Sequence, residues 1–343
     1  GWCSGRDNIM LVVCGSATSW ILSNLSRNRG GLYGRLTCEI KLSPFTLKEC
    51  EDYFKNENIE MSRYDIVQSY MVFGGIPYYL SYFKKGMSFE GNADNILFGK
   101  NPRLKDEFNR LFNAIFSNPE DCKKIIRLLA KKHVGFTREE IAKKTGLPFG
   151  GGLTDTLNAL VESDFIQRYR PYNVSGKVSF YKLIDNFSLF WLKYVEPNTE
   201  DVNFMTDNMT SNIMRVWRGV AFEEVCWQHI GQIKRALGIS GVSSSISAWS
   251  VKGNDNKEGV QIDLLIIRND NVVNLCEMKF AGDIYSIDKE EDAKIRNRIQ
   301  TLINTLSPKQ SVHLTMITTY GVSHTMYGGR VQQQVILDDL FQS

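Results

Sequence analysis

The chain has 343 residues, of which 43% are hydrophobic and 23% charged, and a formal net charge of +3 at pH 7. This length predicts two or three domains that each bury a core, and a charge so near zero neither favours nor excludes nucleic acid as a partner. Seven scattered cysteines without C-x-x-C spacing predict free thiols in a reducing cytoplasm, and no apolar run or signal peptide pattern in the sequence indicates a membrane partner.

The N-terminal segment predicts a strand at residues 9–14 that ends in Gly15-Ser16. A strand that ends in this way and leads into a helix suits contact with an anion at the helix N-terminus. An ordinary strand-to-helix turn explains the same residues equally well. A Gly-rich turn, a strand and a Ser-Pro pair follow at residues 29–47 and lead into a helix.

Residues 62–116 predict a series of helices. The stretch FGGIPYYL at residues 73–80 carries aromatic and aliphatic residues at the spacing of a helix core. Residues 101–116 predict one amphipathic helix whose apolar residues form a single stripe.

Residues 118–185 resemble a winged helix, a common DNA-reading module. The second of its three helices has a capping box, in which Thr137 precedes Glu140 by three residues, and it ends at Gly146. The predicted helices and wing strands are helix 119–132, a helix after Thr137, helix 153–163, strand 165–169 and strand 178–183.

The third helix of this module would enter the major groove, but it contains Asp155 and Glu162 and no Lys or Arg. Contacts with phosphates need cations. The basic residues lie on the earlier helices and around the wing, at Lys131, Lys132, Arg138, Lys143, Lys144, Arg168, Arg170 and Lys177. We therefore expect weak binding to DNA without sequence specificity, or a module that packs between domains.

The C-terminal part begins after an aromatic-rich helix at residues 185–194 and a polar linker that extends to residue 210. A long helix at residues 212–237 contains the adjacent acids Glu223 and Glu224. A strand at residues 245–251 follows.

A β-hairpin is the most informative stretch of the sequence. Two apolar runs rich in β-branched residues, 260–267 and 272–280, flank a turn-forming cluster at residues 268–271. Asp263 lies in the first strand, and Glu277 and Lys279 share one face of the second. The hairpin therefore predicts two carboxylates and an ammonium group at one spot, an arrangement that is costly to bury unless the charges are paired or hold a cation.

A helix at residues 287–306 and a strand at residues 312–319 complete the order αβββαβ. With Asp263, Glu277 and Lys279, this order resembles the core of the PD-(D/E)XK nuclease superfamily. Ile262 stands where many members have Pro, and a half-exposed hairpin with a Glu–Lys pair is the simpler explanation of the bare motif. The resemblance implies that Asp263 and Glu277 hold a magnesium ion and that Lys279 orients the attacking water.

The first helix of that superfamily often adds another acid to the metal site. The segment Gly219 to Glu223, G-V-A-F-E, matches its G-x-x-F-E pattern. The resemblance assigns this role to Glu223, with Glu224 as the alternative, while a solvated helix acid is the plain explanation.

The N-terminal segments resemble archaeal-type P-loop ATPases, which are AAA-like relatives of the STAND class. The matching residues are Gly15, Ser16, Gly34, Arg35, Thr37, Ile40, Leu42, Pro44, Phe45, Glu49, Gly74, Gly75, Pro77, Tyr79 and Leu80. The resemblance implies that Ser16, Arg35 and Pro77 approach the nucleotide. However, the sequence contains no G-x-x-x-x-G-K-[ST] phosphate loop and no Walker B Asp. We therefore expect the C-terminal part of such an ATPase, with ATP bound only in the intact protein.

The sequence thus predicts an α/β multidomain protein. Its expected parts are an ATPase remnant (1–60), a helical lid (61–117), a winged helix (118–185), a connecting helix and linker (186–210) and a nuclease-like domain (211–343). The expected function is metal-dependent cleavage of nucleic acid coupled to an ATPase. The alternative is a nucleotide-driven switch whose winged helix and inactive nuclease-like domain bind a protein or DNA partner.

Overall fold

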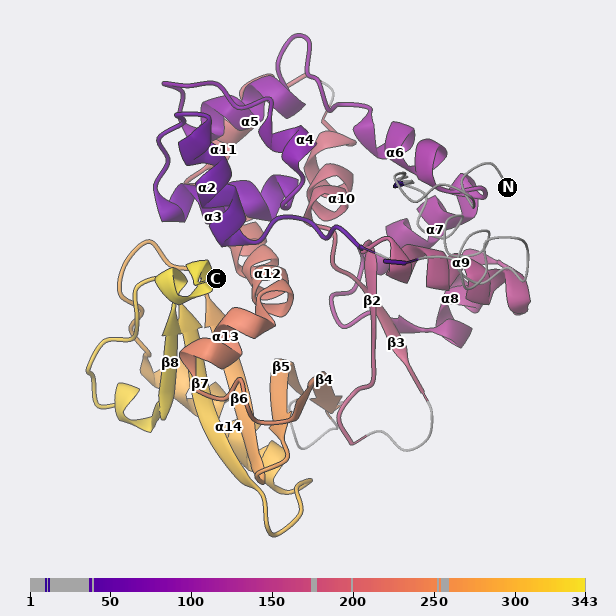
Figure 1. Cartoon of the computed structure of the whole chain (residues 1–343). Coiled ribbons are helices and arrows are strands. Elements are labelled where there is room, and N and C mark those ends of the chain that lie inside the picture. The colour runs from indigo at the N-terminus through magenta and orange to yellow at the C-terminus, as the bar shows by residue number, and fades with distance from the viewer. Residues whose placement is uncertain are drawn as a thin grey trace.

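The computed structural model describes residues 10, 12, 37–38, 40–173, 178–198, 200–251, 253 and 259–342. The structure is mixed α/β, with a helical N-terminal part and a five-stranded mixed sheet near the C-terminus (Figure 1). Ser16, Arg35 and most of the strand predicted at residues 9–14 lie outside the described residues.

The N-terminal helical unit (residues 47–115) consists of α2 (Leu47–Asn56), α3 (Arg63–Phe73), α4 (Pro77–Leu80), α5 (Phe89–Leu97) and α6 (Glu107–Ile115). Helix α2 begins at a capping box formed by Thr46 and Glu49. The amphipathic helix predicted from residue 101 is wrong at its start, because residues 103–106 form turns and α6 begins at Glu107.

The Gly-Gly pair before α4 has a structural cause. Gly74 adopts a positive φ of 63°, which favours glycine. A Cβ on Gly75 would lie 2.0 Å from the carbonyl oxygen of Phe45, and the Phe45 amide donates a 2.7 Å hydrogen bond to the Gly75 carbonyl. The pair therefore lets the segment before α2 pack directly against this part of the unit.

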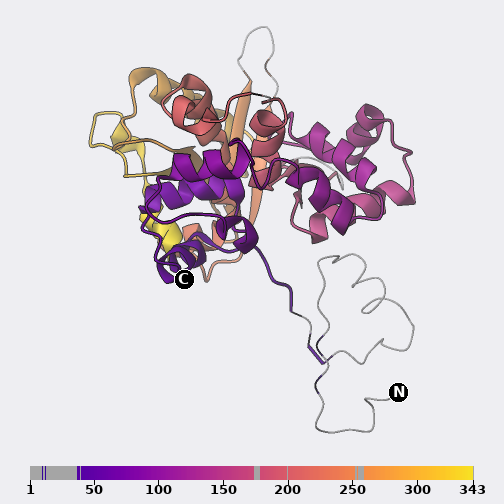
Figure 2. The ribbon, with the colours of Figure 1, turned by 90° about the horizontal axis from the view of Figure 1, so that it is seen from above.

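The middle unit (residues 119–183) lies to one side of the other helices when the molecule is seen from above (Figure 2). It contains α7 (Pro119–Leu129), β1 (Phe136–Thr137), α8 (Arg138–Thr145), α9 (Gly151–Glu162), β2 (Ile166–Tyr169) and β3 (Phe180–Leu183). Its strands form an antiparallel sheet in the order β1-β3-β2. The predicted capping box at Thr137 is confirmed, as is the left-handed C-cap at Gly146.

The elements that connect the middle unit to the sheet are α10 (Asn186–Phe190), a π-helical turn (Trp191–Val195), α11 (Phe204–Asn208), α12 (Asn212–Gln228) and α13 (Ile230–Ala236). The single helix predicted at residues 212–237 is wrong, because it is interrupted at His229. There the imidazole Nε2 accepts a 2.9 Å hydrogen bond from the Leu47 amide, at the first turn of α2. This long-range contact is absent from the local apolar pattern.

The C-terminal unit (residues 212–342) adds β4 (Ser244–Val251), β5 (Val260–Arg268), β6 (Val272–Lys279), α14 (Lys289–Ile303), β7 (Ser311–Thr318), β8 (Gln333–Ile336) and the 3-10 helix η4 (Leu337–Phe341) to α12 and α13. The sheet order is β4-β5-β6-β7-β8. Strands β4, β5 and β6 pair antiparallel, whereas β6, β7 and β8 pair parallel. Helix α14 supplies the crossover that the parallel β6–β7 pair requires. Along the chain, the predicted succession of three strands, a helix and a fourth strand is confirmed as β4, β5, β6, α14 and β7, and β8 was not predicted.

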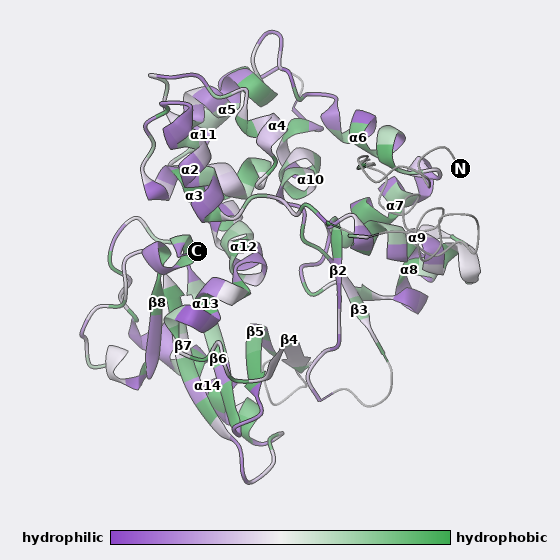
Figure 3. Ribbon diagram, viewed as in Figure 1, coloured by the Kyte–Doolittle hydropathy of each residue, from purple (hydrophilic) through white to green (hydrophobic). Residues whose placement is uncertain are grey.

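Different helices cover the two faces of this sheet, whose central strands are largely hydrophobic (Figure 3). Leu265 and Leu275 pack in a cluster with Ile295 of α14. Leu264 and Cys276 belong to the large cluster that includes the residues of α12. Residues of one strand alternate between these two helical layers.

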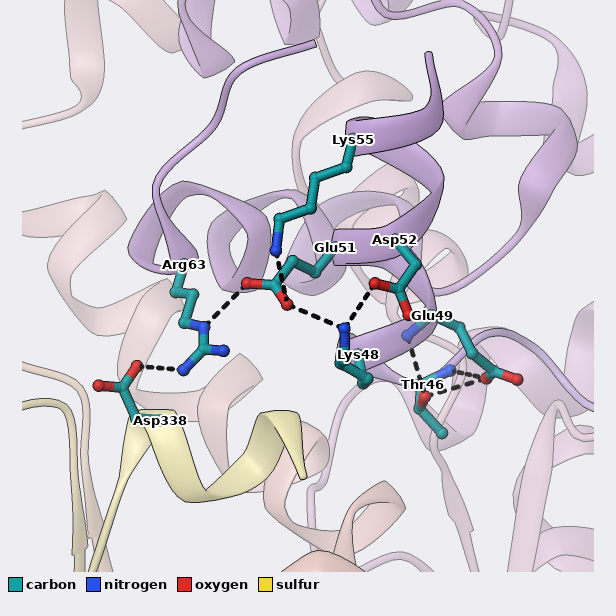
Figure 4. A network of polar contacts seen from close by, with 8 residues as sticks. All are labelled: Thr46, Lys48, Glu49, Glu51, Asp52, Lys55, Arg63 and Asp338. Atoms are coloured by element: carbon teal, nitrogen blue, oxygen red, sulfur yellow. Dashed lines mark hydrogen bonds and ion pairs between the residues drawn. The ribbon is translucent and has the colours of Figure 1, made fainter. Parts of the chain in front are cut away.

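A polar network joins α2 and α3 to η4 near the C-terminus (Figure 4). The Arg63 side chain donates to Glu51 of α2 at 2.9 Å and to Asp338 of η4 at 3.0 Å, and its guanidinium lies over the Phe341 ring. Burial alone would raise the pKa of Glu51, but hydrogen bonds from Arg63 and two lysines lower it to about 2. The network therefore fixes the helical unit against the C-terminal unit.

Two further predictions concern the surroundings of the chain. Within the described residues, no helix combines the length and the apolar character needed to cross a bilayer. The described cysteines, Cys38, Cys50, Cys122, Cys226 and Cys276, are free thiols. This agrees with the scattered spacing in the sequence.

Candidate active site

The predicted site lies at the end of the β5–β6 ladder. The ladder pairs Leu264 with Cys276 and Ile267 with Val273, and its turn contains Asn271 at a positive φ of 65°. Asp263 and Glu277 are the next residues of the two strands beyond the last pair of this ladder, Leu264 with Cys276. Their carboxylates are near enough for the Asp263 charge to raise the pKa of Glu277.

Strand β5 bulges at Asp263. On the edge strand β4, Ser247 pairs with Leu265 and Trp249 pairs with Ile262. Asp263 and Leu264 therefore face the single residue Ala248. A bulge bends its strand and redirects a side chain, and bulges occur often beside active sites. The Asp263 carboxylate accepts a 2.6 Å hydrogen bond from Gln261.

Glu277 is a buried carboxylate. Its residue surface is 8% exposed, and Arg298 of α14 approaches both of its oxygens at 3.1 Å. Burial raises the pKa of Glu277 to about 7, although the charges of Arg298 and Lys279 oppose this rise. The Asp263 charge contributes to this rise, so Asp263 and Glu277 repel each other electrostatically.

Lys279 follows two residues later on the same face of β6. Its ammonium group forms a 2.8 Å ion pair with Glu291 of α14. Burial would lower the pKa of Lys279, but the hydrogen bond with Glu291 and the nearby negative charges raise it. Lys279 is therefore a cation beside Glu277.

Three basic residues of α14, Lys294, Arg296 and Arg298, form ion pairs. Lys294 pairs with Glu290 at 2.6 Å, and Arg296 pairs with Asp292 at 3.0 Å. The third, Arg298, neutralises Glu277. The charges of this helix are thus balanced locally.

Helix α12 brings two more acids to the same region. Burial, followed by the charges of Asp263, Glu224 and Glu277, raises the pKa of Glu223 to about 8. Glu224 is fully buried and pairs with Lys182 of the middle unit at 2.8 Å. The charges of Asp263 and Glu277 both raise the pKa of Glu223. Of these two, only Asp263 raises the pKa of Glu224.

Three neighbours of this site, Lys182, Trp227 and Glu291, were not predicted from the sequence. The Trp227 indole donates a 2.9 Å hydrogen bond to the Asp263 carbonyl. One signal was present, because Trp227 follows Glu223 by four residues and so shares its helix face. Lys182 carried no signal, since its position depends on how two units dock.

The donor set consists of oxygens, which hard cations such as magnesium prefer. Over the described parts of the chain, no three His, Cys, Asp or Glu side chains gather closely enough to hold a metal ion. A carboxylate pair still suits magnesium, which commonly takes one or two protein carboxylates together with water and substrate phosphates.

Of the residues assigned to the nucleotide, Pro77 is described. It is exposed at the first position of α4, where its fixed φ suits the start of a helix. Its contact with a nucleotide stays a prediction, as do the roles of Ser16 and Arg35.

Comparison with known proteins gives a distant relative. No family model matches the chain. An uncharacterized protein of Methanocaldococcus jannaschii is 27% identical over 266 residues, which cover 76% of this chain and 57% of that protein. The chain therefore spans less than two thirds of the length of this relative, and the likeness establishes distant homology without a family assignment.

Proposed function

We propose that the chain is the C-terminal portion of an ATPase and that residues 211–343 form a metal-dependent nuclease of the PD-(D/E)XK type. The observation that supports the proposal is the electrostatic interaction between Asp263 and Glu277 just beyond the end of the β5–β6 ladder, with Lys279 two residues on. The order of α12, β4–β6, α14 and β7 supports it. In this proposal the middle unit is a winged helix and the N-terminal helical unit is the lid of the ATPase.

Asp263 and Glu277 would hold magnesium, with Glu223 close by. When bound, the ion would supply positive charge for the phosphodiester transition state and would lower the pKa of a water molecule. Lys279 would orient that water or neutralise developing negative charge. Because the pKa of Glu277 is raised to about 7, metal binding should strengthen from pH 6 to pH 8 as this carboxyl loses its proton.

The proposal is tested by metal affinity and cleavage together. We expect calorimetry to detect Mn²⁺ binding, and we expect Mg²⁺-dependent cleavage of DNA or RNA. Asp263→Asn should abolish Mn²⁺ binding and reduce the rate of cleavage at least about a hundredfold. Asp270→Asn is the matched control, because Asp270 lies in the turn of the same hairpin and pairs with Arg268.

A second candidate function is favoured by the ion pairs of the site. Glu277 already has Arg298 as a partner, and Lys279 has Glu291. In this alternative the unit is an inactive nuclease-like module, and the intact protein is a nucleotide-driven switch that binds a protein or DNA partner. Wild-type protein that binds no Mn²⁺ and cleaves neither nucleic acid would favour this alternative.

The same proposal assigns ATP binding to the intact protein, because the printed sequence lacks a phosphate loop. It also assigns the protein to the cytoplasm. The free thiols Cys50, Cys122, Cys226 and Cys276, all of them buried, support a reducing compartment.

A further inference from the structure

The backbone of Asp263 is held from outside its own sheet. At a bulge the ladder is locally disrupted, so a strand loses part of its usual restraint. The Trp227 indole of α12 donates a 2.9 Å hydrogen bond to the Asp263 carbonyl oxygen. Trp227 is 3% exposed. This buried donor therefore restrains the one strand position that is both bulged and part of the candidate site.

Trp227 is itself held by the middle unit. The Tyr169 ring of β2 lies 5.6 Å from the indole, and the Lys182 ammonium of β3 lies 4.5 Å from the indole ring centroid. The β2–β3 register pairs Tyr169 with Phe180, two residues before Lys182, so Tyr169 and Lys182 point to the same face of their sheet. That face packs against Trp227 and covers it.

Lys182 is fixed in this position by a buried ion pair. Its side chain is 6% exposed, and it lies 2.8 Å from the Glu224 carboxylate, which is 1% exposed. Breaking one partner of such a pair leaves a buried charge uncompensated, so Lys182 cannot leave without a large cost. The other carboxylate oxygen of Glu224 has no hydrogen-bond partner among the described residues.

The middle unit also touches the strand opposite the bulge (Figure 1). The Tyr172 amide donates a 3.2 Å hydrogen bond to the Ala248 carbonyl, and the Ser247 hydroxyl donates one of 2.8 Å to the Arg170 carbonyl. Ala248 is the β4 residue that faces the bulge. The middle unit therefore contacts the bulge on the β4 side and Trp227 on the α12 side.

We propose that Trp227 is a positioning residue for Asp263, and that the middle unit completes the candidate site by holding Trp227 through Lys182 and Tyr169. The role of Asp263 as a metal ligand rests on the proposed function, whereas the restraint of its backbone does not. The carboxylate pair is then correctly arranged only while the middle unit is docked.

The test compares two buried tryptophans in the full chain. Trp191 is 4% exposed and donates a 2.8 Å hydrogen bond to the Lys105 carbonyl. Trp227→Phe and Trp191→Phe thus lose the same kind of hydrogen bond at nearly equal burial. We expect Trp227→Phe alone to speed hydrogen exchange in the β5 peptide and to weaken Mn²⁺ binding about tenfold.

Lys182 variants test the contribution of the middle unit. Lys182→Met should act like Trp227→Phe, and Lys182→Arg should restore most of the wild-type exchange and affinity. The double variant Lys182→Met/Glu224→Gln removes the ion pair without leaving a buried charge, so it reports on Trp227 even where Lys182→Met unfolds. It should also speed exchange in β5.

The outcomes separate this inference from the proposed function. Equal β5 exchange in Trp227→Phe and Trp191→Phe would overturn the positioning role, whether or not Mn²⁺ binds. Wild-type protein without Mn²⁺ binding would overturn the metal site, while faster β5 exchange specific to Trp227→Phe would still support positioning. Wild-type exchange in the double variant would show that the middle unit does not hold Trp227.

Discussion

Helix α12 contributes residues to two buried polar regions that differ in their chemistry. At its C-terminal end, His229 is 1% exposed and both ring nitrogens have partners. The Nε2 atom accepts from the Leu47 amide, so Nδ1 carries the proton and donates to the Val225 carbonyl at 2.8 Å. Six residues earlier, Glu223 shares its surroundings with Asp263 and Glu277, and like charges oppose one another.

The difference separates architecture from chemistry. A buried polar group with every hydrogen bond satisfied fixes one arrangement of its neighbours. Buried carboxylates that repel each other favour a proton or a cation between them. His229 therefore joins α12 to α2. The repulsion between the carboxylates, in contrast, destabilises the protein, and a bound cation would relieve it. The following predictions test this distinction.

The largest effect is expected from His229→Ala. The change leaves the Leu47 amide buried without an acceptor and removes a ring that packs edge-on against Tyr70 at 5.2 Å. The free energy of unfolding should fall by about 4 kcal/mol. The midpoint of urea unfolding measures this. His324→Ala is the control, because His324 is exposed, and equal midpoints for the two variants would contradict a structural role for His229.

The next effect is a maximum in the free energy of unfolding as the pH is varied. It is expected because His229 loses stability at acidic pH and the buried carboxylates lose it at alkaline pH. Burial lowers the pKa of His229 from 6.5 to about 4, so its contribution is complete above pH 6.5. About 3 kcal/mol is lost as the pH falls toward 4. The pKa of Glu277 is raised from 4.5 to about 7 and that of Glu223 to about 8. Their contribution is complete below pH 4.5 and is lost as the pH rises through 7 and 8.

Thermal unfolding between pH 4 and pH 9 measures the loss of stability on the acidic side and on the alkaline side of the maximum. Mn²⁺ should reduce the loss on the alkaline side, because the cation takes the place of the protons. His229→Ala should flatten only the acidic side. A profile that rises steadily with pH would mean that burial and neighbouring charges do not raise the pKa values of Glu277 and Glu223.

The smallest effect is expected from Asp263→Asn in the absence of metal. Removal of this charge lowers the pKa of both Glu277 and Glu223. The metal-free protein should therefore gain about 1 kcal/mol of stability at pH 8. The melting temperature in EDTA reports the gain. Asp270→Asn should give no gain, because Asp270 pairs with Arg268, and a loss of stability in Asp263→Asn would contradict the repulsion.

Local patterns predicted the elements of the C-terminal unit well. The β5–β6 hairpin lies within one residue of its prediction, because β-branched runs and turn formers identify it without any distant contact. The capping box at Thr137 and Glu140 was found for the same reason. The strand β8, with the sequence Gln333–Ile336, was missed because its polar residues give no strand pattern.

The candidate site was predictable only in part. Asp263, Glu277 and Lys279 follow from alternation along strands that pair in sequence order. The partners Arg298 and Lys182 depend on helix packing and on the docking of separate units, which local pattern does not encode. The bulge at Asp263 likewise arises from β4 pairing, and nothing in the β5 sequence marks it.

The Arg63–Asp338 contact has a consequence for the order of folding. It joins residues separated by 275 positions, and the loop that it closes contains the middle unit and the whole five-stranded sheet. Contacts of such separation form late, since the intervening chain must first become compact. Helices α2 and α3 should therefore dock after the sheet has formed. A contact that forms after the transition state of folding stabilises only the native state. Loss of the Arg63–Asp338 contact should therefore speed unfolding more than it slows folding.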